Sequence, residues 1–163
     1  YVDSVLIAAE MLSKQKRGML AVFLRHTKLD DIIQSGTKLD ADLSSSLLVT
    51  IFGMDTPLHD GAVIVRGNRV ASATCYLPLS DNLGLSKELG TRHRAGVGIS
   101  EITDSLTIIV SEETGKISVA YEGELERNLD ADSLRDRMHK ILNNPVEEHK
   151  NLRIWKGRSR DKK

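Results

Sequence analysis

The sequence predicts a mixed α/β fold, with a central mixed β-sheet flanked by helices. Segments with apolar residues at helical spacing occur near both ends of the chain and between short, strongly apolar runs. Two of those runs are followed by a Gly-containing turn and a second apolar run, which is the pattern of a β-hairpin. Because helices surround hairpins rather than alternating strictly with single strands, we expect a mixed sheet.

The first half of the chain contains three predicted helical segments and one strand. One face of the first helix carries the apolar residues Val2, Val5, Leu6, Ala9 and Leu12. Residues 19–24 then form a predicted buried strand, and residues 30–34 a short helical turn. The next helix has its apolar face at Leu43, Leu47, Ile51 and Phe52. We expect Asp40 or Asp42 to cap that helix and Gly53 to end it.

The second half predicts two hairpins, a loop and two helices. The strands cover residues 62–66, 69–77, 106–110 and 117–121, the loop covers residues 78–90, and the helices begin at Thr91 and after Asp130. The last helix has its apolar face at Leu134, Met138, Ile141 and Leu142. We expect Asp130 to cap it and Pro145 to stop it.

The composition is that of a single folded domain. The 163 residues suffice for one domain, and 40% hydrophobic with 28% charged residues is typical of a folded chain. The single cysteine, Cys75, excludes an intramolecular disulfide, and its place within a strand predicts a core thiol. The longest apolar stretch, residues 5–12, is interrupted by Glu10 and is too short to span a membrane.

The net charge of zero conceals an asymmetry between body and tail. Of the 23 Lys/Arg and 23 Asp/Glu residues, seven bases but only one acid lie within residues 150–163, which leaves 16 bases and 22 acids before them. An acidic body is a poor nonspecific nucleic-acid binder, so we expect no nucleic-acid partner. The basic tail, residues 146–163 with Trp155, is expected to be a solvated, frayed terminus, with contact to an acidic partner or to lipid headgroups as the alternative.

The first candidate site is the segment 56–62, Thr-Pro-Leu-His-Asp-Gly-Ala, directly before an apolar strand. Asp60 can hold a divalent metal or accept a proton from a hydroxyl, and His59 can assist in either role. The alternative is that Asp60 caps a turn while His59 lies on the surface.

The second candidate site is the segment 90–96, Gly-Thr-Arg-His-Arg-Ala-Gly, at the start of a predicted helix. We expect Thr91 to be the N-cap, with free backbone amides behind it that attract anions. Arg92 and Arg94 add forked donors suited to phosphate oxygens, and His93 adds another donor. The alternative is a solvated helix start with carboxylate partners.

A third group, Ser111, Glu112 and Glu113, follows a predicted strand, where it forms either a polar binding edge or a plain acidic turn. The sequence has no Walker A loop, GxGxxG, HExxH, paired CxxC or GxSxG motif. An acid, a phosphate site and a polar strand end, without a covalent nucleophile and its base, favour phosphoryl or nucleotidyl transfer.

His59-Asp60-Gly61-Ala62, followed by Gly90-Thr91-Arg92-His93-Arg94-Ala95, resembles the paired DGA and RHR motifs of the diadenylate cyclase (DAC) family. The spacing, the intervening hairpin and Ser111-Glu112 also fit, over residues 1–145. The chain is most similar to the membrane-anchored CdaA type, because no helix-hairpin-helix module follows as in the DNA-scanning DisA type. The resemblance implies the DAC-domain fold for residues 1–145.

The resemblance further implies an ATP-using enzyme that makes the second messenger cyclic di-AMP and releases two pyrophosphates, with Mg²⁺ or Mn²⁺. His59 and Asp60 would hold the metal, and Asp60 would help to activate the ribose 3′-hydroxyl. Gly61 would allow the nucleotide a close approach to the backbone. The triphosphate would be bound by Thr91, Arg92, His93, Arg94, Ser111 and Glu112, and the adenine by Tyr76 and Leu77.

Symmetric attack by two ATP molecules implies a homodimer with facing sites. The family resemblance also implies a membrane-bound regulator and phosphoglucosamine mutase as partners. It implies that the full-length protein has N-terminal transmembrane helices, with this domain at the cytoplasmic face of the membrane. The chain beginning at Tyr1 would then be a soluble fragment of it. Two alternatives remain: a noncatalytic adenine-nucleotide sensor, and a metal phosphodiesterase, for which the sequence lacks a histidine-rich site.

Overall fold

The structure is a computed structural model that describes residues 1–82 and 84–143. It contains a seven-stranded sheet with the strand order β2-β4-β3-β1-β5-β6-β7. The elements are α1 (Val2–Gln15), β1 (Met19–Phe23), α2 (Asp30–Ser35), β2 (Thr37–Asp42), α3 (Ser45–Ile51), β3 (Ala62–Arg66), β4 (Arg69–Cys75), α4 (Thr91–Ile102), β5 (Leu106–Val110), β6 (Ile117–Tyr121), β7 (Glu124–Glu126) and α5 (Ala131–Leu142). Strands β1 and β3 are parallel and the other neighbours are antiparallel, so the predicted mixed sheet is confirmed.

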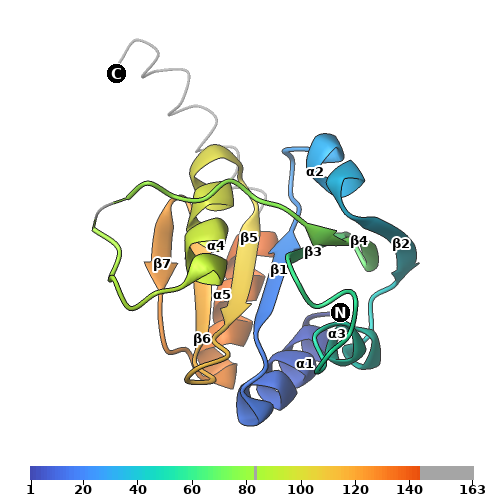
Figure 1. Ribbon diagram of the computed structural model, residues 1–163, viewed down its shortest axis with the longest axis horizontal. Helices are drawn as coiled ribbons and strands as arrows, with labels where there is room; N and C mark the ends of the chain where they lie inside the picture. The colour runs from blue at the N-terminus through green and yellow to red at the C-terminus, as the bar shows by residue number, and fades with distance from the viewer. Residues whose placement is uncertain (83, 144–163) are drawn as a thin grey trace.

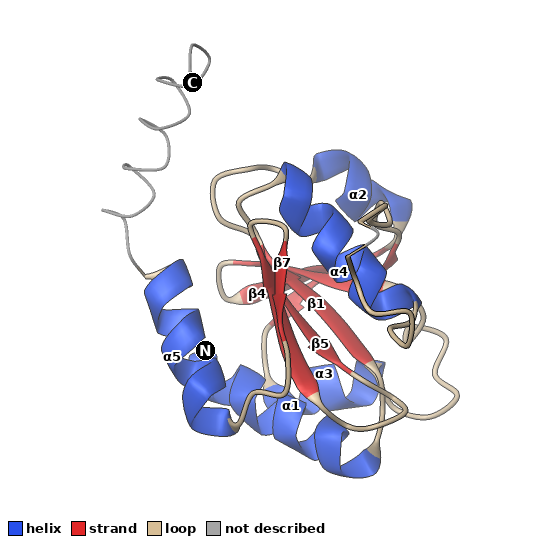
Figure 2. Ribbon diagram, turned by 90° about the vertical axis from the view of Figure 1, so that its left-hand side faces the viewer, coloured by secondary structure: helices blue, strands red, loops and turns tan. Residues whose placement is uncertain are grey.

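The sheet lies between two layers of helices (Figures 1 and 2). Helices α1, α3 and α5 cover one face, and α2 and α4 cover the other. Strands β1, β5 and β6 are buried at every residue, because both of their faces are covered. Their continuous apolar runs are therefore the reason that these strands could be recognised in the sequence.

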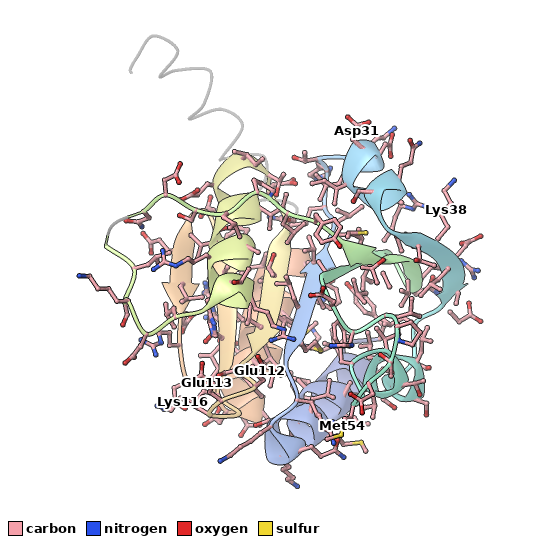
Figure 3. The ribbon with its side chains drawn as sticks, viewed as in Figure 1. Asp31, Lys38, Met54, Glu112, Glu113 and Lys116 are labelled. Carbon is pink, nitrogen blue, oxygen red and sulfur yellow. The ribbon has the colours of Figure 1, made fainter. Side chains whose placement is uncertain are left out.

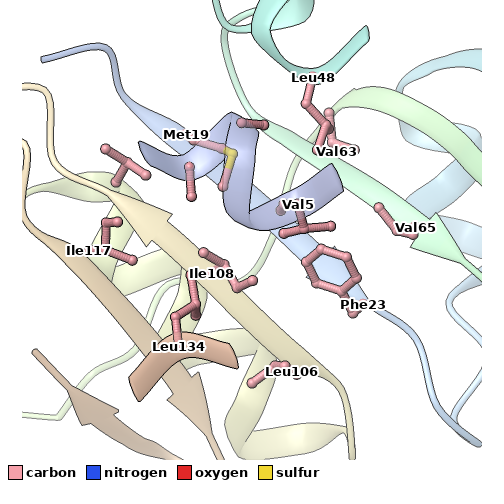
Figure 4. Close-up of a cluster of buried hydrophobic side chains, with 14 of the residues drawn as sticks. Val5, Met19, Phe23, Leu48, Val63, Val65, Leu106, Ile108, Ile117 and Leu134 are labelled. Atoms are coloured by element: carbon pink, nitrogen blue, oxygen red, sulfur yellow. The ribbon is translucent and has the colours of Figure 1, made fainter. Parts of the chain in front are cut away.

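The larger core lies under α1, α3 and α5 (Figure 4). Val5 of α1 and Leu134 of α5 contribute to it from the helices, and Phe23 and Ile108 contribute from the sheet. All four side chains are almost completely inaccessible to water. Burying side chains of this size contributes roughly 1.5–3 kcal/mol each, so this core holds the central strands as a rigid platform.

Strands β2 and β7 were not predicted from the sequence, and both lie at an edge of the sheet. Strand β2 pairs with β4 and carries exposed or half-exposed residues throughout, while β7 pairs with β6 over only three residues. The sequence of an edge strand need not be continuously apolar. Edge strands are often polar, and this polarity protects them against pairing with other chains. Their sequences therefore lack the signal that identified the central strands.

Several predicted helix and strand ends were wrong by a few residues. The cap of α3 is Ser44, whose Oγ accepts a hydrogen bond from Leu47 N at 3.0 Å. Asp40 and Asp42 instead form ion pairs with Arg69 across the β2–β4 edge. Helix α3 reaches its C-cap at Phe52, one residue before the predicted Gly53, and β4 ends at Cys75 rather than at residue 77.

At the other end of the described chain, Asp130 caps α5 as predicted, accepting a hydrogen bond from Ser133 N at 2.8 Å. Cys75 is buried, as expected for a core thiol. The predicted stop at Pro145 and the tail of residues 146–163 with Trp155 lie outside the described residues. Within the described part of the chain, no helix is both long enough and apolar enough to cross a bilayer.

The strand directions bring distant parts of the chain to one edge of the sheet. Strands β1, β3 and β6 start at this edge, and β4, β5 and β7 end there. Residues that precede β3, follow β4, join β5 to β6 and follow β7 are therefore neighbours in space. They include most of the candidate residues.

Candidate functional site

A cavity of about 910 Å³ lies at this edge of the sheet, beside the start of α4. Ten of the eleven predicted site residues line it: His59, Asp60, Gly61, Tyr76, Leu77, Thr91, Arg92, His93, Ser111 and Glu112. Arg94 is the exception, since it does not line the cavity. The sheet thus gathers four separate segments of the sequence into one site of the size of a small-molecule pocket.

His59 and Asp60 lie in the segment that enters β3. The His59 Nδ1 atom is 2.6 Å from the Thr56 carbonyl oxygen, which can only accept, so Nδ1 carries the proton. In the neutral imidazole, Nε2 then has the lone pair that a metal ligand needs. Among the described residues none donates a hydrogen bond to the exposed Asp60 carboxylate, which does not support its alternative role as a turn cap.

His59 and Asp60 could bind a divalent metal only together with further ligands, such as substrate phosphates and water. The described residues contain no group of three or more His, Cys, Asp or Glu side chains that could hold a metal ion alone. Magnesium commonly binds through one or two carboxylates together with substrate phosphates and water. An exposed carboxylate beside an imidazole with a free Nε2 is compatible with that mode of binding.

The backbone conformation and the close packing at position 61 both require glycine. The φ of Gly61, 89°, is in the left-handed region, and a Cβ there would lie 2.9 Å from the Cys75 carbonyl oxygen. The pairing of β3 with β4 shifts register at this point, and Thr74 also has a positive φ of 56°. Contact with β4 therefore demands glycine, while close approach of a nucleotide stays a prediction.

Tyr76 and Leu77 follow this irregular end of β4 and lie beside Gly61 on the cavity wall. Tyr76 is 70% exposed, an unusual degree for an aromatic side chain, and Leu77 is half-buried. An exposed ring and an apolar side chain next to a polar cavity are suited to a flat aromatic ligand.

Helix α4 starts at Thr91, as predicted, but its N-cap is the residue before. Gly90, rather than Thr91, is the N-cap, and no side chain caps the helix. Thr91 is the first helical residue, and it lines the cavity together with Gly90. Since no side chain occupies the first-turn amides, the positive end of the helix dipole faces the cavity and favours an anion there.

Arg92 is the arginine of α4 that faces the cavity. Its Nη1 lies 3.3 Å from Glu112 Oε1, so it joins α4 to the end of β5. Residues two positions apart in a helix do not share a face, which explains why Arg94 does not line the cavity together with Arg92. The two arginines are therefore not brought together as a pair of phosphate donors.

His93 is only 8% exposed at the cavity wall. Burial lowers the pKa of its imidazole, and the positive charges of Arg127 and Arg92 lower it further, against an opposing effect of Glu113. His93 is therefore neutral at pH 7. A neutral imidazole provides one donor and one acceptor but adds no charge to the site.

Ser111, Glu112 and Glu113 form both a turn and a cavity wall. The Ser111 Oγ accepts hydrogen bonds from the backbone amides of Glu113 and Thr114, each at 3.2 Å. Figure 3 shows Glu112, Glu113 and Lys116 together at the turn between β5 and β6. The acidic turn is thus present and lies on the cavity wall, while ligand binding by these residues stays a prediction.

Sequence reasoning missed three charged residues of the cavity: Glu88, Lys116 and Arg127. No local motif marks them. Glu88 belongs to the loop of residues 78–90, Lys116 to the β5–β6 turn, and Arg127 to the residues after β7. Only the strand order brings these three positions to one site, and the β7 strand that positions Arg127 was itself not predicted.

A three-layer α/β fold with an uncapped helix N-terminus, an inward arginine and carboxylates around one cavity is the architecture of an α/β domain whose site is suited to phosphorylated small molecules. The family model for the DAC domain, described as "DisA bacterial checkpoint controller nucleotide-binding", matches residues 6–125. The chain belongs to this family.

Relatives and solved structures agree with that assignment. The chain is 48% identical over 158 residues to the cyclic di-AMP synthase CdaA of Bacillus subtilis, covering 96% of this chain and 58% of that protein. It is 53% identical over 141 residues to a diadenylate cyclase of Listeria monocytogenes, covering 86% and 50%. The crystal structure of a double mutant of DacA from Staphylococcus aureus has a TM-score of 0.86 at 44% identity, covering 88% of this chain and 95% of that one.

A second similar crystal structure is that of a protein described as a hypothetical membrane spanning protein from Bacillus cereus. Its TM-score is 0.76 at 44% identity, and the match covers 78% of this chain and 63% of that chain. The chain spans a little over half of the length of the curated relatives named above.

Proposed function

We propose that this chain is the catalytic domain of a diadenylate cyclase, which condenses two ATP molecules into cyclic di-AMP and two pyrophosphates. The observation that carries the proposal is that Asp60, Arg92 and His93 line one cavity in a chain about half identical to proteins named for this activity. Catalysis is assigned to residues 1–145, and the tail of residues 146–163 is taken to lie outside the catalytic domain.

The proposed chemistry uses residues on opposite sides of the cavity. Asp60 accepts the proton of the ribose 3′-hydroxyl, whose oxygen then forms a bond to the α-phosphorus of another ATP. The bond from that phosphorus to the bridging oxygen breaks, and pyrophosphate leaves with the electron pair. Arg92 and the first-turn amides of α4 stabilise the negative charge on the phosphates. Thr91, His93, Ser111 and Glu112 complete the proposed phosphate site, whereas Arg94, which does not line this cavity, is not included in it.

Tyr76 and Leu77 are the proposed adenine contacts, with the exposed Tyr76 ring packing on the base. Mg²⁺ or Mn²⁺ is the proposed cofactor, held by Asp60 and by the free Nε2 of His59 together with phosphate oxygens. A divalent cation bound there would neutralise charge on the phosphates. Asp60 and His59 would then fix the orientation of the nucleotide relative to the α4 amides.

The proposed reaction requires two copies of the chain. One cavity of this size holds one ATP, and each 3′-oxygen must reach the α-phosphorus of the other nucleotide in line. Two such cavities must therefore face each other, as they do across a twofold axis. Tyr76 and Leu79, which are 70% and 53% exposed at the cavity, would be covered in such a homodimer.

The setting of the whole protein is also a proposal. The relatives are longer than this chain, and one solved neighbour is described as a membrane spanning protein. We therefore place the domain at the cytoplasmic face of the membrane, anchored by segments outside this sequence. Family membership supports a membrane-bound regulator and phosphoglucosamine mutase as partners.

The test is to incubate the purified chain with ATP and either Mg²⁺ or Mn²⁺ over a range of protein concentrations, and to identify products by mass spectrometry. We expect cyclic di-AMP and pyrophosphate, with a specific activity that rises with protein concentration because a dimer is needed. Absence of cyclic di-AMP with both metals, in a sample shown to dimerise, contradicts the proposal. ATP binding without turnover would instead identify a noncatalytic nucleotide sensor.

A further inference from the structure

Arg127 is an arginine of the cavity wall to which no role has been assigned. It follows β7 and lies two residues beyond the end of the family match at residue 125. The sheet alternation explains its direction: Leu125 packs in the core under α4, whereas Glu126 pairs with Arg137 of α5 on the opposite face. Arg127, two residues after Leu125, is thus directed to the α4 side, where the cavity lies.

The structure pairs Arg127 with a carboxylate of the same cavity. Its Nη2 lies 2.9 Å from Glu88 Oε1, and both residues line the cavity wall. The side chains remain 40% and 69% exposed. Exposed ion pairs of this kind contribute little to stability, so a better anion can replace Glu88 at small cost.

Arg92 shows the same arrangement beside His93 in the sequence of α4. Arg92 pairs with Glu112 as Arg127 pairs with Glu88, and all four side chains line the cavity. Both guanidinium groups lower the pKa of His93, so both lie within electrostatic reach of the same imidazole. The cavity therefore presents two forked donors around a neutral histidine, each held by a replaceable carboxylate.

The strand order places Arg127 far from the proposed adenine contacts. Tyr76 and Leu77 follow β4, and Arg127 follows β7, with β3, β1, β5 and β6 between those two strands in the sheet. An ATP molecule whose base lies at the β4 side and whose phosphates pass the start of α4 extends toward β7. Its terminal phosphates are the part that reaches this side of the cavity.

We propose that Arg127 binds the β- and γ-phosphates of ATP, the part that leaves as pyrophosphate, and that these phosphates replace Glu88 as its partner. This inference rests on the proposed function, because it assumes that ATP occupies the cavity. It adds a substrate-binding residue outside the DGA and RHR motifs. It also gives Glu88 a role, which is to hold Arg127 in place until the nucleotide arrives.

The test compares ligands that differ only in their terminal phosphates. Calorimetry with Mg²⁺ would measure the affinities of α,β-methylene-ATP, which cannot form product, and of AMP. For Arg127→Gln we expect the affinity for α,β-methylene-ATP to fall about tenfold to a hundredfold, as for a lost charge-assisted contact. The affinity for AMP should stay within about twofold. Arg127→Lys, which keeps the charge but loses the fork, should give an intermediate affinity.

Two further variants make the test specific. Glu88→Gln removes the competing carboxylate and should raise the affinity for α,β-methylene-ATP, the opposite of the effect at Arg127. Arg135→Gln is the matched control, because Arg135 also forms one exposed ion pair, with Asp3, and does not line the cavity. It should leave both affinities unchanged.

Equal losses for α,β-methylene-ATP and AMP in Arg127→Gln would overturn the inference, since Arg127 would then support the whole site. An unchanged affinity for both ligands would overturn it as well. The wild-type product assay separates this result from failure of the proposed function. If cyclic di-AMP forms while Arg127→Gln binds both ligands normally, the inference alone fails; if the wild type binds no α,β-methylene-ATP, both fail.

Discussion

Gly18 and Arg92 are in such close contact that any side chain at position 18 would displace the Arg92 guanidinium group. A Cβ on Gly18 would lie 2.6 Å from Arg92 Nε, and the three nearest atoms it would meet all belong to the Arg92 guanidinium group. Gly18 precedes β1, while Arg92 lies on α4 and also pairs with Glu112 at the end of β5. The backbone before β1 therefore forms the surface on which the guanidinium group of Arg92 rests.

Gly18→Ala should consequently lower activity without unfolding the protein. The atoms that must move belong to a flexible side chain, so the fold can adjust, but Arg92 loses its position. We expect kcat/KM for cyclic di-AMP formation to fall about tenfold to a hundredfold, as for a misplaced contact to a reacting group. The melting temperature should not fall, because replacing glycine also reduces the entropy of the unfolded chain.

A double-mutant cycle tests this cause. If Gly18→Ala acts through Arg92, it should have almost no further effect on kcat/KM in an Arg92→Gln background. Additive losses would show that Gly18 acts by another route, and a lower melting temperature of Gly18→Ala would show that the fold cannot adjust.

Asp60→Asn should separate catalysis from stability. The carboxylate is exposed on the cavity wall, and among the described residues none donates a hydrogen bond to it. The amide keeps the size of the side chain but cannot accept the 3′-hydroxyl proton, so we expect kcat to fall by about a hundredfold to ten-thousandfold. The free energy of unfolding, measured in urea, should change by less than about 0.5 kcal/mol. A large loss of stability would instead support a structural role of Asp60 as a turn cap.

The buried histidine of the cavity, His93, predicts a pH dependence of stability. Burial, Arg127 and Arg92 hold the pKa of His93 below its ordinary value of 6.5. Below about pH 6.5 the unfolded chain therefore binds a proton that the folded chain resists, and the free energy of unfolding decreases as the pH falls. Above that pH both states are neutral at this residue, and the contribution is constant.

His93→Gln removes this dependence. Urea unfolding of both proteins at several pH values between 5 and 8 should show that the wild type loses stability relative to the variant as the pH falls below about 6.5. Above pH 7 the difference between them should be constant. A difference that stays constant over the whole range would contradict the assigned environment of His93.

The parts of this molecule that could be predicted from the sequence are those whose signal lies within one short segment of the chain. Strands β1, β5 and β6 are buried on both faces, so continuous apolar runs identify them, whereas the edge strands β2 and β7 have no such signal. Asp60 and the α4 motif were recognisable because each lies in one short segment. Glu88 and Arg127 were not, because only the order of the strands brings them to the cavity, and Gly18 was not, because only the fold places it against Arg92.

Two glycines of α4 carry a last prediction, because they face different obstacles. A Cβ at Gly98 would meet the backbone of Pro78, with the Pro78 carbonyl carbon at 2.8 Å, where the loop of residues 78–90 begins. A Cβ at Gly96 would lie 2.8 Å from Ile109 Cδ1, the flexible end of a side chain. Backbone cannot move aside without carrying the loop with it, whereas a terminal methyl group can.

Gly98→Ala should therefore destabilise the protein by about 1–3 kcal/mol, the usual effect of forcing extra atoms into a packed region. Gly96→Ala should change the free energy of unfolding by less than about 1 kcal/mol, because the higher helix propensity of alanine offsets the displacement of Ile109. Urea unfolding of both variants would measure the contrast. Equal effects would show that the loop of residues 78–90 yields as easily as a side chain.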